Sequence, residues 1–146
     1  MKALVIRHPF AHFVADGKKT LEIKPIRAKH RGPLLIIAGQ ALHEGSCIIE
    51  GTEMECLETV KMLWRLDETL SMGKAIAIVD MVGCRLMIPE DAAAAMHTFK
   101  PDHYVWEFTN ARRIKPFHVC GQLGIMNVEV EESEIEFITS PQLSTP

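Results

Sequence analysis

Lys19, Glu22 and Lys24 bring two amines and one carboxylate close together in the sequence. Residues Thr20 to Lys24 alternate polar and apolar side chains, which predicts a strand with Glu22 and Lys24 on one face. Lys19 comes just before this strand and can reach the same face. Such a lysine can hold a phosphate as a point charge, and the carboxylate can accept hydrogen bonds from a base edge or a ribose hydroxyl.

The pair of Lys19 and Glu22 also suits two other roles. A desolvated lysine can act as a general base while the glutamate shuttles protons, which would make the two residues catalytic. Alternatively, the two side chains can form an ion pair that only fixes the wall of a cleft. The residue types and their spacing leave recognition, catalysis and this structural role open.

Basic residues are concentrated around this group. The chain has 16 Lys and Arg residues against 19 Asp and Glu residues, a formal net charge of -3. The basic residues between positions 18 and 31 are Lys18, Lys19, Lys24, Arg27, Lys29 and Arg31. A weakly acidic chain with one dense basic segment predicts a local anion site. We expect Arg27, Lys29 and Arg31 to be outer phosphate contacts of that site.

The elements that must position these side chains follow from hydrophobic periodicity and turn residues. Strands are predicted at 3–7, 20–24, 34–38, 74–84, 103–108, 114–119 and 123–128. Helices are predicted between Pro9 and Gly17, from a capping box at 52–55 to a point before Gly73, and from Pro89 through the alanines at 92–95. The acidic segment 129–136 is expected to be an exposed edge strand kept from pairing by its charges. These elements predict a mixed α+β domain, a partly closed β-barrel of about six strands with about three flanking helices.

Length and composition predict one domain. A chain of 146 residues with 47% hydrophobic content can bury a sizeable core, so we expect a single domain over 1–138 and a flexible tail over 139–146. No apolar run approaches the ~20 residues that a membrane-spanning helix needs, and no membrane contact is expected. The first residues include Arg7 and Asp16 and lack the apolar block of a secretory signal. We therefore expect a cytoplasmic protein whose cysteines are free thiols.

Aromatic and basic residues near the end of the chain are further candidates. Tyr104 can stack on a base, whereas Trp106 is predicted to be in the barrel core. Arg112 and Arg113 can extend the basic surface. Other large aromatic residues predicted to be in the core are Phe10, Phe13 and Trp64.

The histidine pair His8 and His12 has the i, i+4 spacing that suits a metal ion, but no third ligand is evident. We interpret His8 as a cap at the helix start and His12 as a surface histidine. Neither a metal ion nor another cofactor is expected.

Four stretches of the chain, in order, resemble the ASCH domain, a branch of the PUA-like superfamily. Residues 6–11 (IRHPFA) resemble its opening IRQPWA element, and residues 17–24 (GKKTLEIK) resemble its G-x-K-x-x-E-x-R signature. Residues 30–36 (HRGPLLI) resemble the YRGPLLI strand, and the segments YVWEF, RRI and GQLG between 104 and 124 resemble the closing motifs. The likeness covers roughly residues 1–130 apart from 40–72. It departs from the family at Lys24, where arginine is usual, at His8 for glutamine and at Met126 for tryptophan.

The resemblance implies a PUA-like barrel with a basic cleft that binds RNA or a nucleotide-like ligand. It places Lys19, Glu22 and Lys24 at that cleft and adds Arg7, from the first motif, to the expected binding residues. The charge distribution points to the same segment. The expected partner is therefore RNA or a nucleotide-like ligand.

Two alternatives to simple binding remain open. Some relatives are small amidohydrolases acting on acetylated cytidine through a lysine, a threonine and a glutamate; aligned on Lys19, the threonine position holds Glu22 here. Others have been proposed as ribonucleases. One alternative is thus a small hydrolase acting on a modified nucleoside or an RNA phosphodiester through Lys19 and Glu22. The other is a protein-interaction surface on the acidic helix near Trp64.

Overall fold

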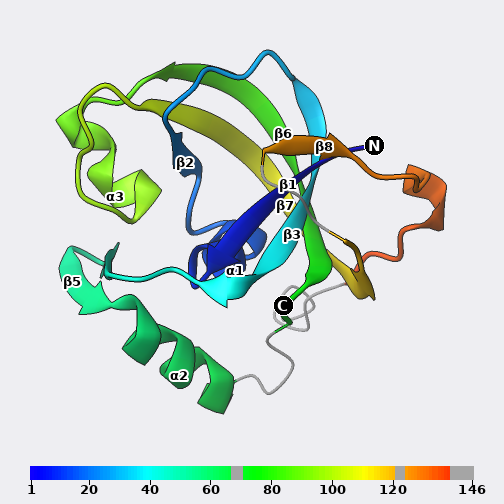
Figure 1. Cartoon of the computed structure of the whole chain (residues 1–146), viewed down its shortest axis with the longest axis horizontal. Coiled ribbons are helices and arrows are strands. Elements are labelled where there is room, and N and C mark those ends of the chain that lie inside the picture. The colour runs from blue at the N-terminus through cyan, green and yellow to red at the C-terminus, as the bar shows by residue number, and fades with distance from the viewer. Residues whose placement is uncertain (67–70, 121–123, 139–146) are drawn as a thin grey trace, which may run out of the picture.

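The computed structural model describes residues 1–66, 71–120 and 124–138 (Figure 1). Its strands are β1 (Lys2–His8), β2 (Leu21–Lys24), β3 (Gly32–Leu42), β4 (Ser46–Ile49), β5 (Thr52–Glu55), β6 (Lys74–Leu86), β7 (Tyr104–His118) and β8 (Ile125–Asn127). Its helices are α1 (Phe10–Ala15), α2 (Cys56–Leu66) and α3 (Ala92–Ala95), and short 3-10 turns lie at Pro89–Asp91 and Glu132–Glu134. The predicted class, a mixed α+β domain, is confirmed.

A six-stranded sheet organises the fold, in the order β2-β7-β6-β3-β1-β8. β1 and β3 run parallel, whereas the other neighbouring strands in this sheet are antiparallel. β2 and β8 form its two edges, so the sheet curls without closing, as Figure 1 shows. β4 and β5 form a separate hairpin that leads into α2.

The sheet is buried on both of its faces, which explains the unbroken apolar run in β3. Leu34 and Ile36 pack on one face with α1, while Leu35 and Ile37 pack on the other face with Ile78. Successive side chains of a strand point to opposite faces, so a strand covered on both sides needs apolar residues at every position. Trp106 and Phe13 are also buried, as predicted.

The predicted capping box at 52–55 is wrong. Thr52–Glu55 is strand β5, which pairs with β4 because Glu50 and Gly51 adopt left-handed conformations (φ 49° and 79°) and form a tight hairpin turn. α2 therefore begins at Cys56, and its predicted end before Gly73 lies partly outside the described residues. This start places Cys56, Thr59 and Val60 on the buried face. Trp64, predicted to be in the core, is 49% exposed.

Two other segments differ from the predictions. The strands expected at 103–108 and 114–119 are one strand, β7, which bends where its pairing register shifts and where Asn110 takes a left-handed conformation (φ 53°). The acidic segment 129–136 is not an edge strand but contains a 3-10 turn, and its glutamates are exposed. A ladder would bring such like charges together, whereas a turn lets them separate into water. The strand expected at 123–128 is β8, and position 123 and the expected tail at 139–146 lie outside the described residues.

The described helices include none long and apolar enough to span a membrane.

The four cysteines are free and differ in exposure, which predicts a graded reaction with a thiol reagent. Cys120 is exposed, Cys84 is half-buried, and Cys47 and Cys56 are buried. Burial also raises the pKa of the Cys56 thiol to about 12, which suppresses the reactive thiolate. We expect Cys120 to react first with Ellman's reagent, Cys84 more slowly, and Cys47 and Cys56 only after unfolding. Rapid reaction of all four thiols in the native protein would contradict the burial seen here.

Candidate functional site

A turn after α1 directs Lys19 into the interior. Gly17 adopts a left-handed conformation (φ 84°) and its N–H donates to the carbonyl of Val14, which ends the helix. The backbone N–H of Lys19 then donates to the carbonyl of Phe13 at 3.0 Å. As a result, the lysine side chain runs inward and is only 2% exposed.

The buried amine of Lys19 has several partners. Its Nζ donates to the carbonyl of Ala95, lies 3.5 Å from Glu22 Oε1 and sits 4.8 Å from the centre of the Phe10 ring. Burial lowers the pKa of Lys19, and the nearby carboxylate of Glu22 opposes that shift. The two side chains therefore form the buried ion pair that the sequence allowed as one of three roles.

Strand β2 supplies the acidic and basic groups that follow Lys19. β2 pairs with β7, setting Glu22 opposite Trp106 and Lys24 opposite Tyr104. The indole N–H of Trp106 donates to the carbonyl of Ile26 at 3.0 Å, which holds the chain just after the strand. Glu22 is 8% exposed, while Lys24 is half-buried.

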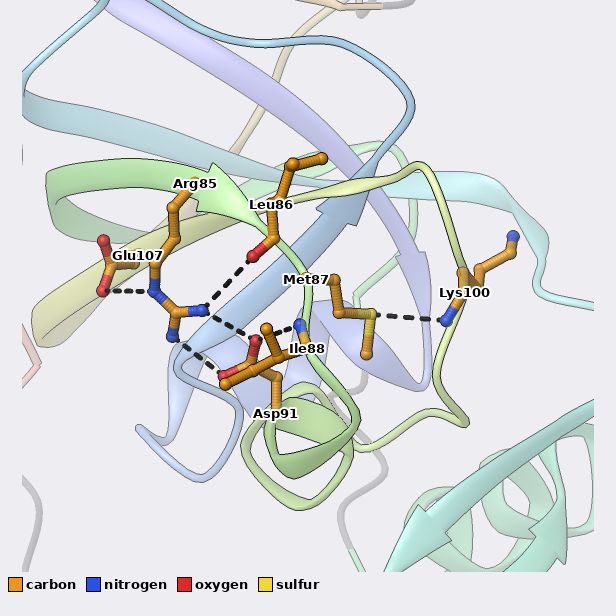
Figure 2. Close-up of polar contacts among 7 residues, drawn as sticks. All are labelled: Arg85, Leu86, Met87, Ile88, Asp91, Lys100 and Glu107. Carbon is orange, nitrogen blue, oxygen red and sulfur yellow. Dashed lines mark hydrogen bonds and ion pairs between the residues drawn. The ribbon is translucent and has the colours of Figure 1, made fainter.

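The long connection from β6 to β7 forms the opposite wall, and a polar network fixes it (Figure 2). Arg85 donates from both terminal nitrogens to the two carboxylate oxygens of Asp91, each at 2.8 Å. Asp91 also accepts the N–H of Ile88 at 2.9 Å, and Arg85 Nε lies 3.6 Å from Glu107. These contacts anchor the 3-10 turn that leads into α3.

Met87 closes the other end of this connection. Its N–H donates to the carbonyl of His103 at 2.9 Å. Figure 2 shows the second contact, in which the Lys100 N–H donates to the Met87 sulfur at 3.5 Å. Between these anchors α3 ends at Met96, which is left-handed (φ 55°). The carbonyl of Ala95 lies at the end of the helix, where carbonyls have no partner within the helix. It accepts a hydrogen bond from Lys19 Nζ instead.

A cleft of about 310 Å³ lies between these walls. Its lining combines four cations, one carboxylate, two histidines and apolar side chains: Arg7, Lys19, Lys24, Lys100, Glu22, His43, His97, Phe10, Val5, Ile6 and Ile23. The volume is at the small end of the range for ligand pockets, roughly 300–1,000 Å³. The cleft therefore has room for a small group such as one nucleotide unit and a positive lining to attract an anion.

Among the predicted site residues, Arg7, Lys19, Glu22 and Lys24 all line the cleft. They come from β1, from the turn after α1 and from β2, so the fold brings separate segments together.

The other predicted site residues are not among those that line it: Arg27, Lys29, Arg31, Tyr104, Arg112 and Arg113. Arg27 covers the ring of Tyr104 at 5.2 Å, which occupies one face of that ring. Arg31 donates to the carbonyls of Ala28 and His30, and Lys29 is exposed.

Arg112 and Arg113 have partners elsewhere. Arg112 pairs with Asp80 at 2.9 Å, and Arg113 donates to His12 Nδ1 at 3.2 Å, against α1. Both guanidinium groups thus have structural partners.

Besides the aliphatic residues Val5, Ile6 and Ile23, the cleft contains four residues that sequence reasoning did not place there. Phe10 was assigned only to the core, and His43, His97 and Lys100 belong to no recognised motif. The rings of Phe10 and His43 meet edge to face with centroids 4.9 Å apart, and those of His43 and His97 lie 6.0 Å apart. Nothing in the local sequence pattern predicts these two ring contacts, because they join three distant parts of the chain.

The interpretation of His8 as a helix cap is wrong. His8 is the last residue of β1 and is 1% exposed, and its Nε2 lies 2.5 Å from the carbonyl of Ser71. His12 is half-buried and lies 3.6 Å from Asp16. Within the described ranges, no group of three or more His, Cys, Asp or Glu side chains could hold a metal ion.

Comparison with known proteins identifies the family and the fold. The family model of the ASCH domain matches residues 4–118. Crystal structures of two single-substitution mutants of the ZmASCH protein from Zymomonas mobilis are similar to this chain, with a TM-score of 0.55 for each. The first is 9% identical and the match covers 91% of this chain and 93% of that one; the second is 10% identical and covers 91% of each. No curated protein matches the sequence. The structural likeness confirms the PUA-like fold, and the match to the family model over most of the sequence shows that the chain belongs to the ASCH domain family.

Proposed function

We propose that this protein binds single-stranded RNA, or a nucleotide-like ligand, in the cleft beside β2. The observation that carries the proposal is the concentration of Arg7, Lys19, Lys24 and Lys100 around one small hollow in a chain whose net charge is -3. A positively lined concavity in a weakly acidic protein attracts an anion to that one place, whereas the rest of the surface has no excess of positive charge. The ASCH domain is a PUA-like family whose members often bind RNA, which supports the same ligand class.

The cleft residues have different roles in this proposal. Arg7 and Lys100 are exposed and Lys24 is half-buried, so their charges can reach a phosphate. Lys19 is already satisfied by Ala95 and Glu22 and acts mainly by holding that carboxylate in place. Glu22 then accepts hydrogen bonds from a base edge or a ribose hydroxyl. Arg27, Lys29 and Arg31, which lie outside the lining, supply outer phosphate contacts.

Removing one cleft cation should weaken RNA binding and its salt dependence together. A phosphate contact releases counterions, and log affinity therefore falls as log salt concentration rises. Each phosphate contact that is lost should make this slope less steep by about 0.7 to 1. We expect Lys24→Ala, Arg7→Ala and Lys100→Ala each to reduce affinity severalfold for a fluorescein-labelled oligouridylate. Fluorescence anisotropy at low and moderate salt measures both quantities.

Lys115→Ala is the matched control for this experiment. Lys115 is an exposed lysine on β7 that pairs with Glu136 at 3.7 Å and is not among the residues of the cleft. Its removal changes the net charge equally and should leave affinity almost unchanged. The proposal fails if the oligonucleotide does not bind, or if the cleft variants and the control behave alike.

A hydrolase is the second candidate function, and the buried Lys19 favours it. Burial lowers the pKa of that amine, and Glu22 lies 3.5 Å away, as a general base with a proton shuttle requires. The bond from Lys19 to Ala95 argues for a structural role instead. Incubating the protein with acylated nucleosides and with RNA separates the two, because a binding protein retains affinity and shows no turnover.

A further inference from the structure

Two imidazole rings share the cleft with its cations. His43 follows the end of β3, and His97 follows the end of α3. Both rings also contact Phe10, at centroid distances of 4.9 and 6.2 Å. In His97, Nδ1 lies 2.9 Å from the carbonyl of Thr98. A carbonyl can only accept, so Nδ1 donates this hydrogen bond and Nε2 is the remaining nitrogen of the ring.

We propose that His43 and His97 are ligand-binding residues whose protonation is coupled to the anion, so that the cleft takes up a proton when it binds a phosphate group. The inference rests on the proposed function, because it assumes that an anion occupies this cleft. It goes further by assigning two binding residues and a direction of pH dependence. Affinity for a phosphodiester should rise as the pH falls.

The argument begins with the charges that surround His43 when the cleft is empty. Burial lowers the pKa of His43. Repulsion from His97 when that ring is protonated, and from the cations Arg7 and Lys100, lowers it further, while Glu22 opposes them. A proton on this ring therefore adds one more positive charge to a site that already holds several. The neutral ring is favoured until something compensates that charge.

A bound phosphate reverses the balance. Its negative charge lies among the cations and favours the imidazolium form of each ring, which can then donate a hydrogen bond to a phosphate oxygen. Because binding and protonation are reciprocal, an anion that favours the protonated ring binds more tightly at a pH where the proton is available. The same effect is weaker for a neutral nucleoside.

Carboxylates on the far side of His43 do not change this sign. His43 also lines a neighbouring hollow whose walls include Glu44, Glu53 and Glu55. These groups favour the protonated ring both before and after the anion binds. The direction of the effect is therefore set by the bound anion. Lys19 and Lys24, on the other wall, act like the remaining cations.

Isothermal titration calorimetry with an oligouridylate lacking a terminal phosphate tests the proposal. Uracil and the phosphodiester do not titrate between about pH 5.5 and pH 8, so any proton taken up belongs to the protein. We expect affinity to rise roughly fivefold or more across this range at constant ionic strength. Titrations in two buffers of different ionisation enthalpy should show net proton uptake by the protein at about pH 6.5.

Substitutions assign the protons to the two rings. His43→Gln and His97→Gln should each reduce proton uptake, and the double variant should bind with almost no pH dependence. His118→Gln is the control, because His118 is exposed at the far end of β7 and outside the cleft. Circular dichroism shows whether each variant is folded, and either single variant is sufficient if the other fails.

The outcomes separate this inference from the proposed function. Tight binding that is independent of pH overturns the histidine assignment and leaves RNA binding standing. Uptake that persists in the double variant also overturns it and points to Lys19. No binding at any pH contradicts both proposals.

Discussion

Lys19→Met should lower the free energy of unfolding by roughly 3–5 kcal/mol, the cost of removing one partner from a buried ion pair. Methionine fills a similar volume but lacks the amine, which donates to Ala95 and lies 3.5 Å from Glu22. The substitution leaves the Ala95 carbonyl without this donor and the carboxylate, 8% exposed, without its counter-charge. Urea denaturation followed by circular dichroism measures the change.

A second substitution tests the reason for that loss. If an uncompensated charge causes most of it, Lys19→Met combined with Glu22→Gln should recover at least about 1 kcal/mol, since an amide carries no charge. The Glu22→Gln single variant completes the double-mutant cycle. A Lys19→Met variant as stable as the wild type would show that the buried amine contributes no net stability.

How much of this site the sequence predicts depends on how local each feature is. The alternation from Thr20 to Lys24 and the glycine at position 17 are local signals, and they predict β2 and the turn before it correctly. The contact between Lys19 and Ala95 joins residues 76 positions apart and has no local signal. His43 and His97 reach the cleft for the same reason, through the ends of β3 and α3.

The errors in the fold have similar physical causes. Thr52 and Glu55 have the residue types of a capping box, but the left-handed residues Glu50 and Gly51 make a hairpin instead. β7 contains polar residues in its middle that resemble a turn, yet pairing with β6 carries the strand through them. In both cases pairing with a neighbouring strand outweighs a local preference.

The family motifs predict the fold better than they predict the cleft. Residues 4–118 match the family model, which accounts for the sheet and for the position of β2 within it. The wall that carries His97 and Lys100 depends instead on Arg85 and Asp91, which no motif includes. The position of this wall therefore depends on a few contacts outside the motifs.

Asp91→Asn should lower the free energy of unfolding by about 1–2 kcal/mol at neutral pH and also weaken ligand binding. A hydrogen bond to a charged group contributes about 1.5–3 kcal/mol, and the lower value applies here because Arg85 is partly exposed to solvent. The change removes the bidentate contact with Arg85 and disturbs the acceptor of the Ile88 N–H. The segment that carries Ala95 and the cleft residues after α3 is then held less firmly. We therefore expect a lower midpoint of thermal denaturation and a weaker affinity for RNA, measured by anisotropy.

The pH dependence of this effect has a definite sign. Hydrogen bonds from Arg85, with a further one from the Ile88 N–H, hold the pKa of Asp91 below its ordinary value of 3.8, although burial opposes them. The carboxylate therefore contributes its full stability above about pH 4 and loses it as the pH falls through the lower, folded-state pKa. The difference between wild type and Asp91→Asn should be constant from about pH 7 to pH 5 and shrink in stronger acid.

Glu90→Gln is the matched control, because Glu90 is an exposed acidic residue of the same turn and makes the same change of charge. Its unfolding free energy should stay within about 0.5 kcal/mol of the wild type. If Asp91→Asn is no less stable than this control, the bidentate pair does not hold the wall. If the difference persists unchanged in strong acid, the ionised carboxylate of Asp91 is not its source.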